Sequence, residues 1–489
     1  MRHLRTPRRP AAALAALAAA AAVTISVTAG AAGAAASGPA AGPPPCSLKP
    51  PPFPTTKPTT VTTIGQAYSC IFDHYYAAAT LDDRGLLAAS FAGLTQQLDR
   101  LGLDQPGATL PALTGNHDSD WTRFAAVYQR ITGKLPTKAV RQQAAEATVT
   151  AMVKALNNNH SYWFKPGPLP PGCHHGFCPP YGLGLFTSPD AFRAQRNPGA
   201  ALPPLYVNFV DPGSPAARAG VRPGDVITKV DGSAPFTDGM YSPGVTNLLY
   251  QQYPQRQTVR TTLRWPVTGA TRTITLTPAT YYPPRCPQCA LVPSRLLAGH
   301  IGYLQLGGFD PTAGSEVLAA ISKLEKKATL RGIILDLRGN IGGAPAGIAG
   351  VAGLLEHGKP WGYSCPLTGT CTAEYPNSKK PLLHLPLAVL TDRACVSACD
   401  QFAAAVKDLH LGTLIGTRTA GATGAAAVFS RILNDGSALQ LTTKTFLGAG
   451  HEIIDGIGVA PDYYIPLTAQ DVATGHDPDV AKALALLGR

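Results

Sequence analysis

Strand-like and helix-forming runs alternate from about residue 295 to residue 489. Two of the strand-like runs, "GIILDLRG" and "PLAVLTD", are each followed by a turn of small residues and then by a helix-forming run. This alternation is typical of a layered α/β domain, in which helices cover the faces of a sheet. We therefore expect residues 295–489 to form an α/β core.

The rest of the chain divides into segments of different composition. Residues 181–280 contain short strand-like runs separated by Gly and Pro, which is typical of a compact β-rich module. Apolar residues recur at helical spacing within residues 64–165, and residues 37–63 are rich in Pro and Thr, as linkers are. A single hydrophobic core rarely organises 489 residues, so the length also favours several domains.

The N-terminal segment has the features of an export signal. Arginines are concentrated before Pro10, an apolar run extends from Ala11 to about Val27, and small residues precede a cleavage site near Ala36. Residues 1–36 therefore predict a cleaved signal peptide and a secreted, extracellular protein. No later apolar run approaches the roughly 18–20 residues that a membrane-spanning helix needs, so we expect no membrane span.

The formal net charge of +12 is not concentrated in a dense cluster of Lys and Arg. Nucleic-acid-binding surfaces normally contain such a cluster. We therefore interpret the charge as a solvated basic surface and expect no nucleic-acid partner. Nothing in the sequence predicts an oligomeric state.

All ten cysteines follow the predicted signal peptide, and an even number in an exported chain favours disulfide bonds. Four pairs are close in the sequence: Cys173 with Cys178, Cys286 with Cys289, Cys365 with Cys371, and Cys395 with Cys399. The alternative is a zinc site, because "CHHGFC" and "CPQC" contain groups that bind zinc. These two segments lie far apart in the chain, so we expect local disulfides, no metal and no other cofactor.

Two turns after strand-like runs contain candidate catalytic groups. Gly342 and Gly343 can present backbone N–H groups to a substrate carbonyl with no side chain in the way. Their turn lacks the GK[ST] sequence of a phosphate-binding loop. Ser397 lies at the start of a helix, where it is either a nucleophile or an N-cap. Cys395 and Cys399 are either buried thiols or a disulfide that clamps the turn of Ser397.

The β-rich module resembles a bacterial PDZ domain. "GSPAARAGVRPGDVITKVDG" is similar to the helix, turn and strand of that fold, and "YGLGLF" is similar to its carboxylate-binding loop. The resemblance predicts that Gly182, Leu183, Gly184 and Leu185 bind a peptide terminus, while an adjacent strand edge accepts the peptide by β-augmentation. The alternative is a module that only braces its neighbour.

Together the two turns resemble motifs of the C-terminal processing (tail-specific) peptidases. "LDLRGNIGG" is similar to their LDLR-x-N-x-GG motif, and "ACVSACDQF" is similar to the segment around their catalytic serine, which falls on Ser397. The resemblance extends over about residues 64–466. It implies a crotonase-like α/β core, serine endopeptidase activity without a metal, and polypeptide substrates presented by a tail. It also implies that Gly343 and Ala398, with Gly342 beside them, stabilise the oxyanion.

The chain departs from this family at the lysine base. The family pattern is similar to GEPTFGKG, but the corresponding "GTRTAGATG" has Ala422 at the lysine position. "NNNHSYWF" instead resembles the D-x-H-T segment of the branch that includes the tricorn protease core, in which the histidine is the general base. This resemblance implies His160 as the base, Asp455 in "IIDGIGVAPDYYIP" as its supporting acid, and Ser161 as a relay between them. Lys444 is an alternative base.

The resemblance therefore implies a secreted serine endopeptidase that captures a polypeptide, in part through its PDZ-like module, and cleaves it by acyl transfer. In this mechanism His160 takes the proton of Ser397, and Asp455 holds the imidazole. The alternative, motivated by Ala422, is a catalytically disabled peptidase fold that binds peptides or hydrophobic ligands.

Overall fold

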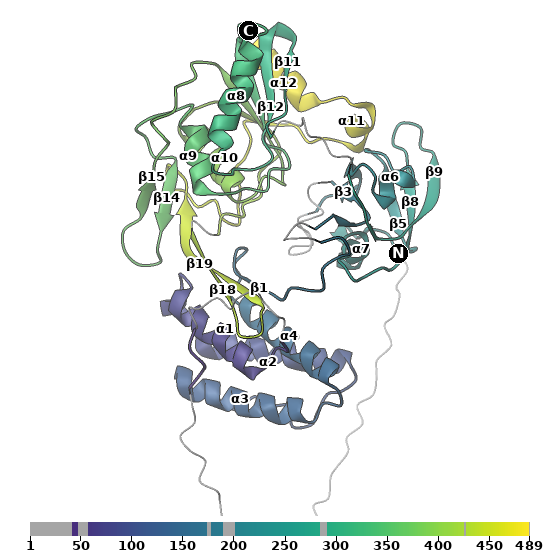
Figure 1. Ribbon diagram of the computed structural model, residues 1–489, viewed down its shortest axis with the longest axis vertical. Helices are drawn as coiled ribbons and strands as arrows, with labels where there is room; N and C mark the ends of the chain where they lie inside the picture. The colour runs from purple at the N-terminus through teal and green to yellow at the C-terminus, as the bar shows by residue number, and fades with distance from the viewer. Residues whose placement is uncertain are drawn as a thin grey trace, which may run out of the picture. The chain divides into compact units, whose positions relative to one another are not determined.

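A computed structural model, shown in Figure 1, describes residues 42–46, 57–173, 178–188, 201–283, 291–424 and 427–488. The predicted signal peptide, the greater part of the predicted linker, and Cys286 with Cys289 lie outside the described residues. Among the residues that are described, no helix is long and apolar enough to cross a membrane.

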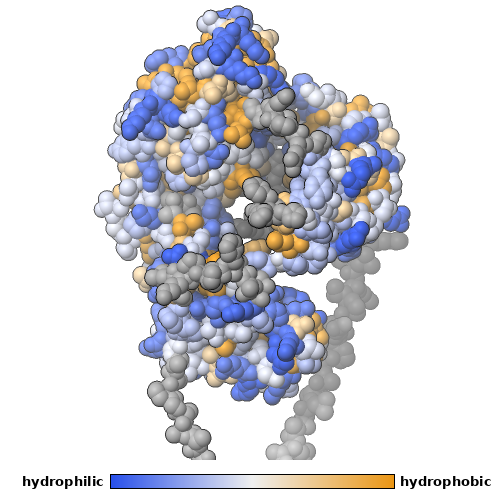
Figure 2. Space-filling model, viewed as in Figure 1, coloured by the Kyte–Doolittle hydropathy of each residue, from blue (hydrophilic) through white to orange (hydrophobic). Residues whose placement is uncertain are grey.

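A group of four helices precedes the other domains. They are α1 (Val61–His74), α2 (Asp83–Arg100), α3 (His117–Gly133) and α4 (Lys138–Lys154), with a short 3-10 helix η1 (Ala78–Thr80). The side chains of Asp82, Asn116 and Thr137 cap α2, α3 and α4 by accepting backbone N–H groups, as these residue types commonly do. The apolar faces share one buried cluster, whereas the visible surface of this region in Figure 2 is mostly hydrophilic.

A long hairpin packs against these helices. It consists of β18 (Ala427–Ile432) and β19 (Ala438–Leu447), and Leu433, Leu439 and Leu441 belong to the buried cluster of the helices. β19 also belongs to a five-stranded sheet with β1 (Tyr162–Phe164), β14 (Gly362–Cys365) and β15 (Thr372–Glu374). Because Tyr162 pairs with Gln440, the residues just before β1 are anchored beside β19.

The β-rich module runs from Tyr181 to Thr280 and has its own apolar core. Its elements are β2 (Tyr181–Gly182), β3 (Leu185–Thr187), β4 (Val207–Val210), α6 (Pro215–Arg218), β5 (Val226–Val230), β6 (Phe236–Thr237), β7 (Met240–Tyr241), α7 (Pro243–Leu249), β8 (Val259–Arg264), β9 (Thr271–Leu276) and β10 (Ala279–Thr280). Side chains from β3 and α7 meet in this core, including Leu185, Val245 and Leu249.

The last domain is built on a six-stranded sheet, as the alternation of strand and helix runs predicts. Its strands, in spatial order, are β11 (Ser294–Leu297), β12 (Ile301–Gln305), β13 (Gly332–Asp336), β16 (Leu387–Thr391), β17 (Thr413–Gly416) and β20 (Tyr463–Tyr464). Only the β11–β12 pair is antiparallel. Since the other strands are parallel, the carboxyl ends of neighbouring β13 and β16 meet at one edge, where α/β proteins commonly form their sites.

Helices cover both faces of this sheet. The helices on these faces are α8 (Ala313–Glu325), α9 (Pro345–Ala352), α10 (Ala398–Asp408) and α12 (Pro478–Leu487). The short helices η3 (Ala298–His300) and α11 (Ala469–Thr474) precede β12 and α12, respectively. Ile333 and Leu335 of β13 share a buried cluster with residues of α8, α9 and α10. Ile334, between them, belongs to a second cluster with Ala483 of α12. This alternation follows from the opposite directions of successive side chains along a strand.

Three of the four predicted cysteine pairs are disulfides: Cys173–Cys178, Cys365–Cys371 and Cys395–Cys399. A fourth disulfide, Cys46–Cys70, ties the segment before α1 to that helix, and the sequence spacing did not indicate it. Cys173 and Cys178 are therefore not thiolate ligands for zinc, while His174 and His175 lie outside the described residues.

Candidate active site

Ser397 lies in the turn between β16 and α10, at the carboxyl edge of the central sheet. It is the N-cap residue of α10 and has φ 58° and ψ −117°, a region that costs a non-glycine residue about 1–3 kcal/mol. Asp400 helps to hold this conformation, because its Oδ2 accepts the Ser397 N–H at 2.9 Å. We call residues 392–397 the nucleophile turn. Backbone strain of this kind persists where the surrounding structure imposes it, which is common at functional sites.

His160 reaches Ser397 from a distant part of the chain. It lies between α4 and β1, and its Nε2 is 3.1 Å from Ser397 Oγ although 237 residues separate them. The other ring nitrogen, Nδ1, is 2.6 Å from Oδ1 of Asn159. Asn159 Nδ2 in turn donates to Asp455 Oδ1 at 2.8 Å. Ser397, His160, Asn159 and Asp455 therefore form one continuous hydrogen-bonded chain.

The chemistry of this chain determines where its protons lie. An ionised Asp455 carboxylate can only accept, so Asn159 must turn its NH₂ group toward it and its Oδ1 toward His160. Oδ1 is an acceptor, so Nδ1 of a neutral His160 carries the proton. Nε2 then has a free lone pair facing the hydroxyl of Ser397. This is the tautomer that a general base requires.

Ser161 does not lie between the base and the acid, in contrast to the sequence-based expectation. Its Oγ donates to Asn158 Oδ1 at 3.1 Å and accepts the Thr442 N–H at 3.0 Å. The Ser161 hydroxyl therefore links the turn before β1 to β19 through these two hydrogen bonds. The neighbouring Asn159 connects His160 with Asp455 instead. In the sequence, the only signal for Asn159 is its position beside His160 in "NNNH".

The turn after β13 approaches Ser397 closely. We call residues 337–343 the glycine turn. A Cβ on Gly342 would lie 2.6 Å from the Val396 carbonyl oxygen and 2.8 Å from Ser397 Cβ, so only glycine fits there. The Gly342 N–H is not available to a substrate, because it donates to Asn340 Oδ1 at 2.8 Å. This differs from its predicted place among the oxyanion donors.

Gly343 and Ala398 present the two available N–H groups. Within the part of the chain that the structure describes, neither backbone N–H has a hydrogen-bond acceptor. Ala398 is the first residue of α10, where the N–H groups of a helix lack intrahelical partners. Its nitrogen would lie 3.0 Å from a Cβ on Gly342, so the two turns bring these donors to one place beside Ser397.

Comparisons with known proteins identify two regions of the chain that resemble known families. Residues 300–465 match the model described as peptidase family S41, and residues 206–239 match the model of the PDZ domain. Residues 300–465 are therefore similar to peptidase family S41, and residues 206–239 are similar to a PDZ domain. We call residues 300–465 the S41 domain because of this similarity. This range extends from β12 to β20 and includes both turns and Asp455, while His160 lies outside it.

Curated relatives with similar sequences are named as C-terminal processing peptidases. Carboxyl-terminal-processing peptidase 2, chloroplastic, of Arabidopsis thaliana is 32% identical over 264 residues, which cover 54% of this chain and 50% of the relative. The carboxy-terminal processing protease CtpA of Bacillus subtilis is 29% identical over 262 residues, which cover 51% of this chain and 50% of the relative. The chain thus spans about half the length of the curated relatives it matches, and it resembles the C-terminal processing peptidases as its motifs predict.

Solved structures confirm a multidomain α/β fold. The photosystem II D1 C-terminal processing protease aligns with a TM-score of 0.51 at 23% identity, over 88% of this chain and 97% of that one. Mature CPAF complexed with lactacystin aligns with a TM-score of 0.54 at 14% identity, over 88% of this chain and 98% of that one. At these identities the likeness establishes the fold alone.

The loop that has lost the S41 lysine lies against the nucleophile turn. Asp400, which is fully buried, accepts the N–H groups of Gly421 at 2.7 Å and Ala422 at 3.0 Å as well as that of Ser397. A Cβ on Gly424 would lie 2.5 Å from Asn159 Oδ1. The loop with Ala422 therefore packs against the turn with His160. Lys444 of β19 opposes Ala427 of β18 and makes no hydrogen bond to Ser397 among the described contacts.

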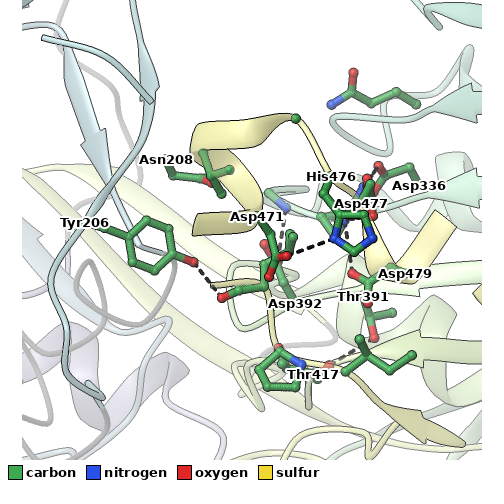
Figure 3. Close-up of a pocket in the computed structure, with 18 of the residues that line it drawn as sticks. Tyr206, Asn208, Asp336, Thr391, Asp392, Thr417, Asp471, His476, Asp477 and Asp479 are labelled. Atoms are coloured by element: carbon green, nitrogen blue, oxygen red, sulfur yellow. Dashed lines mark hydrogen bonds and ion pairs between the residues drawn. The ribbon is translucent and has the colours of Figure 1, made fainter. Parts of the chain in front are cut away.

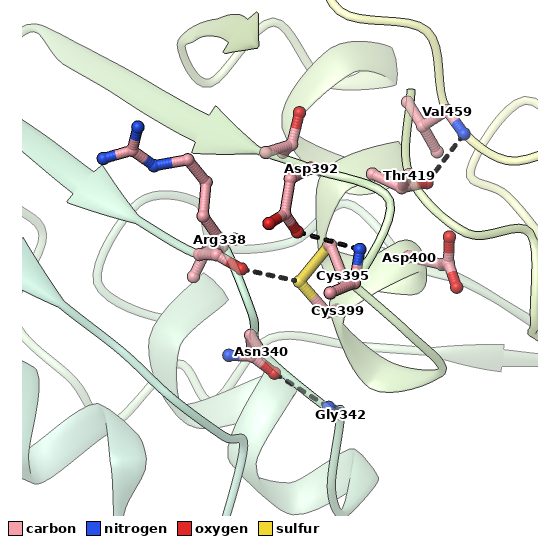
Figure 4. The surroundings of a disulfide bond; sticks show 12 residues. Arg338, Asn340, Gly342, Asp392, Cys395, Cys399, Asp400, Thr419 and Val459 are labelled. Atoms are coloured by element: carbon pink, nitrogen blue, oxygen red, sulfur yellow. Dashed lines mark hydrogen bonds between the residues drawn. A yellow bond between two sulfur atoms is a disulfide. The ribbon is translucent and has the colours of Figure 1, made fainter. Parts of the chain in front are cut away.

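The Cys395–Cys399 disulfide, shown in Figure 4, closes a short loop of the chain. Ser397 lies within this loop by its position in the sequence. The Cα atoms of the two cysteines are 5.2 Å apart and both side chains are fully buried. Cys395 lies in the nucleophile turn and Cys399 in the first turn of α10, so the bond joins the two ends of the strained segment. The sequence-based alternative of two buried free thiols is wrong.

We expect the double variant Cys395→Ser/Cys399→Ser to lose about tenfold in kcat. Without the bond, the turn that positions Ser397 and the Ala398 N–H is held less firmly, and a loss of about 1.4 kcal/mol of transition-state stabilisation corresponds to a tenfold change in rate. The measurement is kcat on a peptide substrate. Cys365→Ser/Cys371→Ser removes a loop of similar size outside both turns and is the control. Equal kcat in both double variants would show that the bond does not hold the turn.

The predicted peptide-binding loop of the PDZ domain lies at the start of β3. Gly184 has φ 70°, and a Cβ there would lie 2.1 Å from Ser214 Cβ. The carbonyl oxygens of Leu183 and Gly184 accept N–H groups from within the domain, and the side chains of Leu183 and Leu185 are buried. Gly182 pairs with Ala279 of β10. These contacts hold the loop rigidly against α6.

Proposed function

We propose that this protein is a secreted serine endopeptidase of the C-terminal processing type, in which Ser397 is the nucleophile and His160 the general base. The observation that carries the proposal is the continuous hydrogen-bonded chain from Ser397 through His160 and Asn159 to Asp455. Nucleophile, base and orienting group within hydrogen-bond reach of one another are the signature of covalent catalysis by an activated hydroxyl.

The first step follows from the proton positions in this chain. His160 Nε2 accepts the proton of Ser397 Oγ as the oxygen attacks the carbonyl carbon of the scissile peptide. The imidazolium that forms donates from Nδ1 to Asn159 Oδ1. Asp455 holds Asn159 in this orientation by accepting its Nδ2 group, and so orients the imidazole indirectly. His160 then gives its proton to the leaving amine, and an acyl-enzyme remains on Ser397. In deacylation, His160 accepts a proton from water as the water oxygen attacks the acyl carbonyl carbon. The bond from that carbon to Ser397 Oγ then breaks, His160 returns the proton to Oγ, and the product leaves as a carboxylic acid.

The negative charge of the tetrahedral intermediate requires donors beside Ser397. Gly343 and Ala398 supply the two unpaired N–H groups at this position, and the dipole of α10 adds positive potential at its N-terminus. Gly342 is not a donor, because its N–H is bonded to Asn340. Its lack of a side chain lets the glycine turn approach Ser397 closely. Removing one such donor commonly lowers turnover by a factor on the order of 10²–10³.

The substrate proposed here is a polypeptide that reaches the site through an unstructured or C-terminal tail. The relatives are named as C-terminal processing peptidases, and the PDZ domain contains a glycine loop suited to a terminal carboxylate. On the edge of β3, the Thr187 N–H already donates to the hydroxyl of Tyr250 at 2.9 Å. Capture therefore relies on Gly182, Leu183, Gly184 and Leu185 and the terminal residues of the tail.

Secretion and a crotonase-like architecture complete the proposal. The basic and apolar run of residues 1–36 supports export, and the disulfides suit an oxidising compartment. The crotonase-like assignment is supported by the parallel strands with helices on both faces, which expose the two catalytic turns at one edge.

Active-site labelling tests the function. We expect the wild-type protein to react with a fluorophosphonate probe, and mass spectrometry of the digested product to locate the modification on Ser397. A correctly folded protein that stays unlabelled and cleaves no unstructured polypeptide would support the alternative, a disabled peptidase fold that binds peptides or hydrophobic ligands. Labelling of a different serine would move the nucleophile away from the nucleophile turn.

A further inference from the structure

The two turns that meet at Ser397 leave neighbouring strands, β13 and β16, and each supplies one proposed oxyanion donor. Gly343 is the last residue of the glycine turn, whereas Ala398 directly follows the nucleophile turn. The distance between the two N–H groups therefore depends on how firmly one turn is held against the other. An error of about 1 Å in such a site commonly costs on the order of a hundredfold in rate.

Asp392 joins the two turns through a single oxygen atom. Its Oδ1 accepts the Gly339 N–H of the glycine turn at 3.0 Å and the Ala394 N–H of its own turn at 2.9 Å. Figure 4 shows this carboxylate between the chain at Arg338 and the chain before Cys395. Apart from it, the Val396 N–H donates to the Asn340 carbonyl oxygen at 3.0 Å and provides a second link between the turns.

Arg338, a charged residue near Asp392, forms its ion pairs with other carboxylates. Arg338 forms ion pairs with Asp336 at 2.6 Å, Asp477 at 2.8 Å and Asp479 at 3.0 Å. In Figure 3 these carboxylates surround one side of a cavity of about 360 Å³ that Asp392 also borders. Among the described contacts, Asp392 has no ion pair of its own. Its two partners on the turns are the backbone N–H groups of Gly339 and Ala394, so Asp392 acts there as a hydrogen-bond acceptor.

The environment of Asp392 tolerates a neutral side chain. Burial raises the pKa of its carboxyl to about 6, and nearby Asp336 adds to the shift, while the two amide donors and Arg338 oppose it. Because the charged form is disfavoured by burial, an uncharged amide of the same shape should fit this position at little cost.

We propose that Asp392 is a positioning residue, whose Oδ1 fixes the glycine turn against the nucleophile turn and so sets the spacing of the Gly343 and Ala398 N–H groups. The inference rests on the proposed function and extends it, since Asp392 touches neither the reacting atoms nor His160. The positioning depends on Oδ1 as a hydrogen-bond acceptor and does not depend on the negative charge of the carboxylate. Among the described hydrogen bonds, losing that oxygen leaves the Val396 link as the only one between the two turns.

Two substitutions separate the acceptor from the charge. Asp392→Ala removes Oδ1, and we expect kcat to fall by about 10–100-fold, with KM within about twofold, because the displaced donors serve the transition state and not the bound substrate. Asp392→Asn keeps an oxygen acceptor and should recover kcat to within about threefold of the wild type. Thermal unfolding of each variant reports whether it has folded.

A transition-state analogue gives a readout that a general loss of stability would not change. A peptide boronate forms a tetrahedral adduct with the serine, so its inhibition constant should rise in Asp392→Ala by the same factor as kcat falls. Asp462→Ala is the matched control, because Asp462 Oδ2 also accepts a backbone N–H of the sheet, from Leu414 at 2.8 Å, and contacts neither turn. This control should match the wild type in both measurements.

Three outcomes would overturn the inference. They are a folded Asp392→Ala variant with wild-type kcat, a loss of kcat without weaker boronate binding, and an Asp392→Asn variant as slow as Asp392→Ala. The last outcome would assign the effect to charge. Failure of the proposed function is distinguishable from all three, because the wild-type protein itself would then be inactive toward peptide and probe.

Discussion

Replacing Ser397 by alanine is expected to lower kcat on a peptide substrate by at least about 10⁴-fold. The hydroxyl is the group that attacks, and loss of the nucleophile in such sites leaves only the residual rate provided by binding and oxyanion stabilisation. The fold should persist, because Asp400 accepts the Ser397 backbone N–H and the disulfide does not involve the hydroxyl. Steady-state kinetics and loss of fluorophosphonate labelling measure the effect.

The matched control tests the alternative that Ser397 is only a helix cap. Thr137 caps α4 by accepting the Val140 N–H at 3.2 Å, far from the site in the chain. Thr137→Ala should lose about 1 kcal/mol of stability and no turnover. If Ser397→Ala behaved in the same way, with lower stability and undiminished turnover, the serine would be structural and the proposed mechanism wrong.

Replacing His160 by alanine is expected to lower kcat/KM by at least about 10³-fold, because Ser397 then has no base within hydrogen-bond reach. In the wild type, kcat/KM should fall as the pH drops below about 6.5, where an imidazole ordinarily becomes protonated. A protonated His160 cannot accept the proton of Ser397, so activity is lost on the acid side. Rates measured from pH 5 to 9 test this expectation.

Two further variants identify the group that titrates. Asp392 has a pKa raised to about 6 by burial, so its ionisation falls in the same range, and an acid limb that persists in Asp392→Asn belongs to His160. Lys444→Ala examines the alternative base on β19. Full activity in His160→Ala, together with loss in Lys444→Ala, would transfer the role of base to the lysine.

Much of the fold was predictable because the signals are local. The alternation of strands and helices after residue 295 reflects periodicities of side-chain burial that each segment satisfies by itself. The glycines of the PDZ loop and of the glycine turn were recognisable because positive φ angles and close approach require that residue. Cys395 and Cys399 were close enough in sequence for their pairing to be considered.

The hydrogen-bonded chain of the site was only partly predictable. Motif positions indicated Ser397, His160 and Asp455, but the link between the last two is Asn159, and Ser161 binds β19 instead. The two side chains are neighbours in sequence and point to different partners, a difference that depends on the backbone of the turn before β1. The use of the Gly342 N–H by Asn340 likewise depends on the conformation of the glycine turn.

Short-range pattern and motif were enough to predict the elements and the residue types: an α/β core, a PDZ domain, a serine at a helix start, a histidine before a strand, and an alanine where a lysine was expected. Three features required the folded chain. They are the pairing of β1 with β19, the packing of the loop with Ala422 against the turn with His160, and the 3.1 Å distance from His160 Nε2 to Ser397 Oγ. Contacts across 237 residues arise from the packing of whole elements, and no local pattern specifies them.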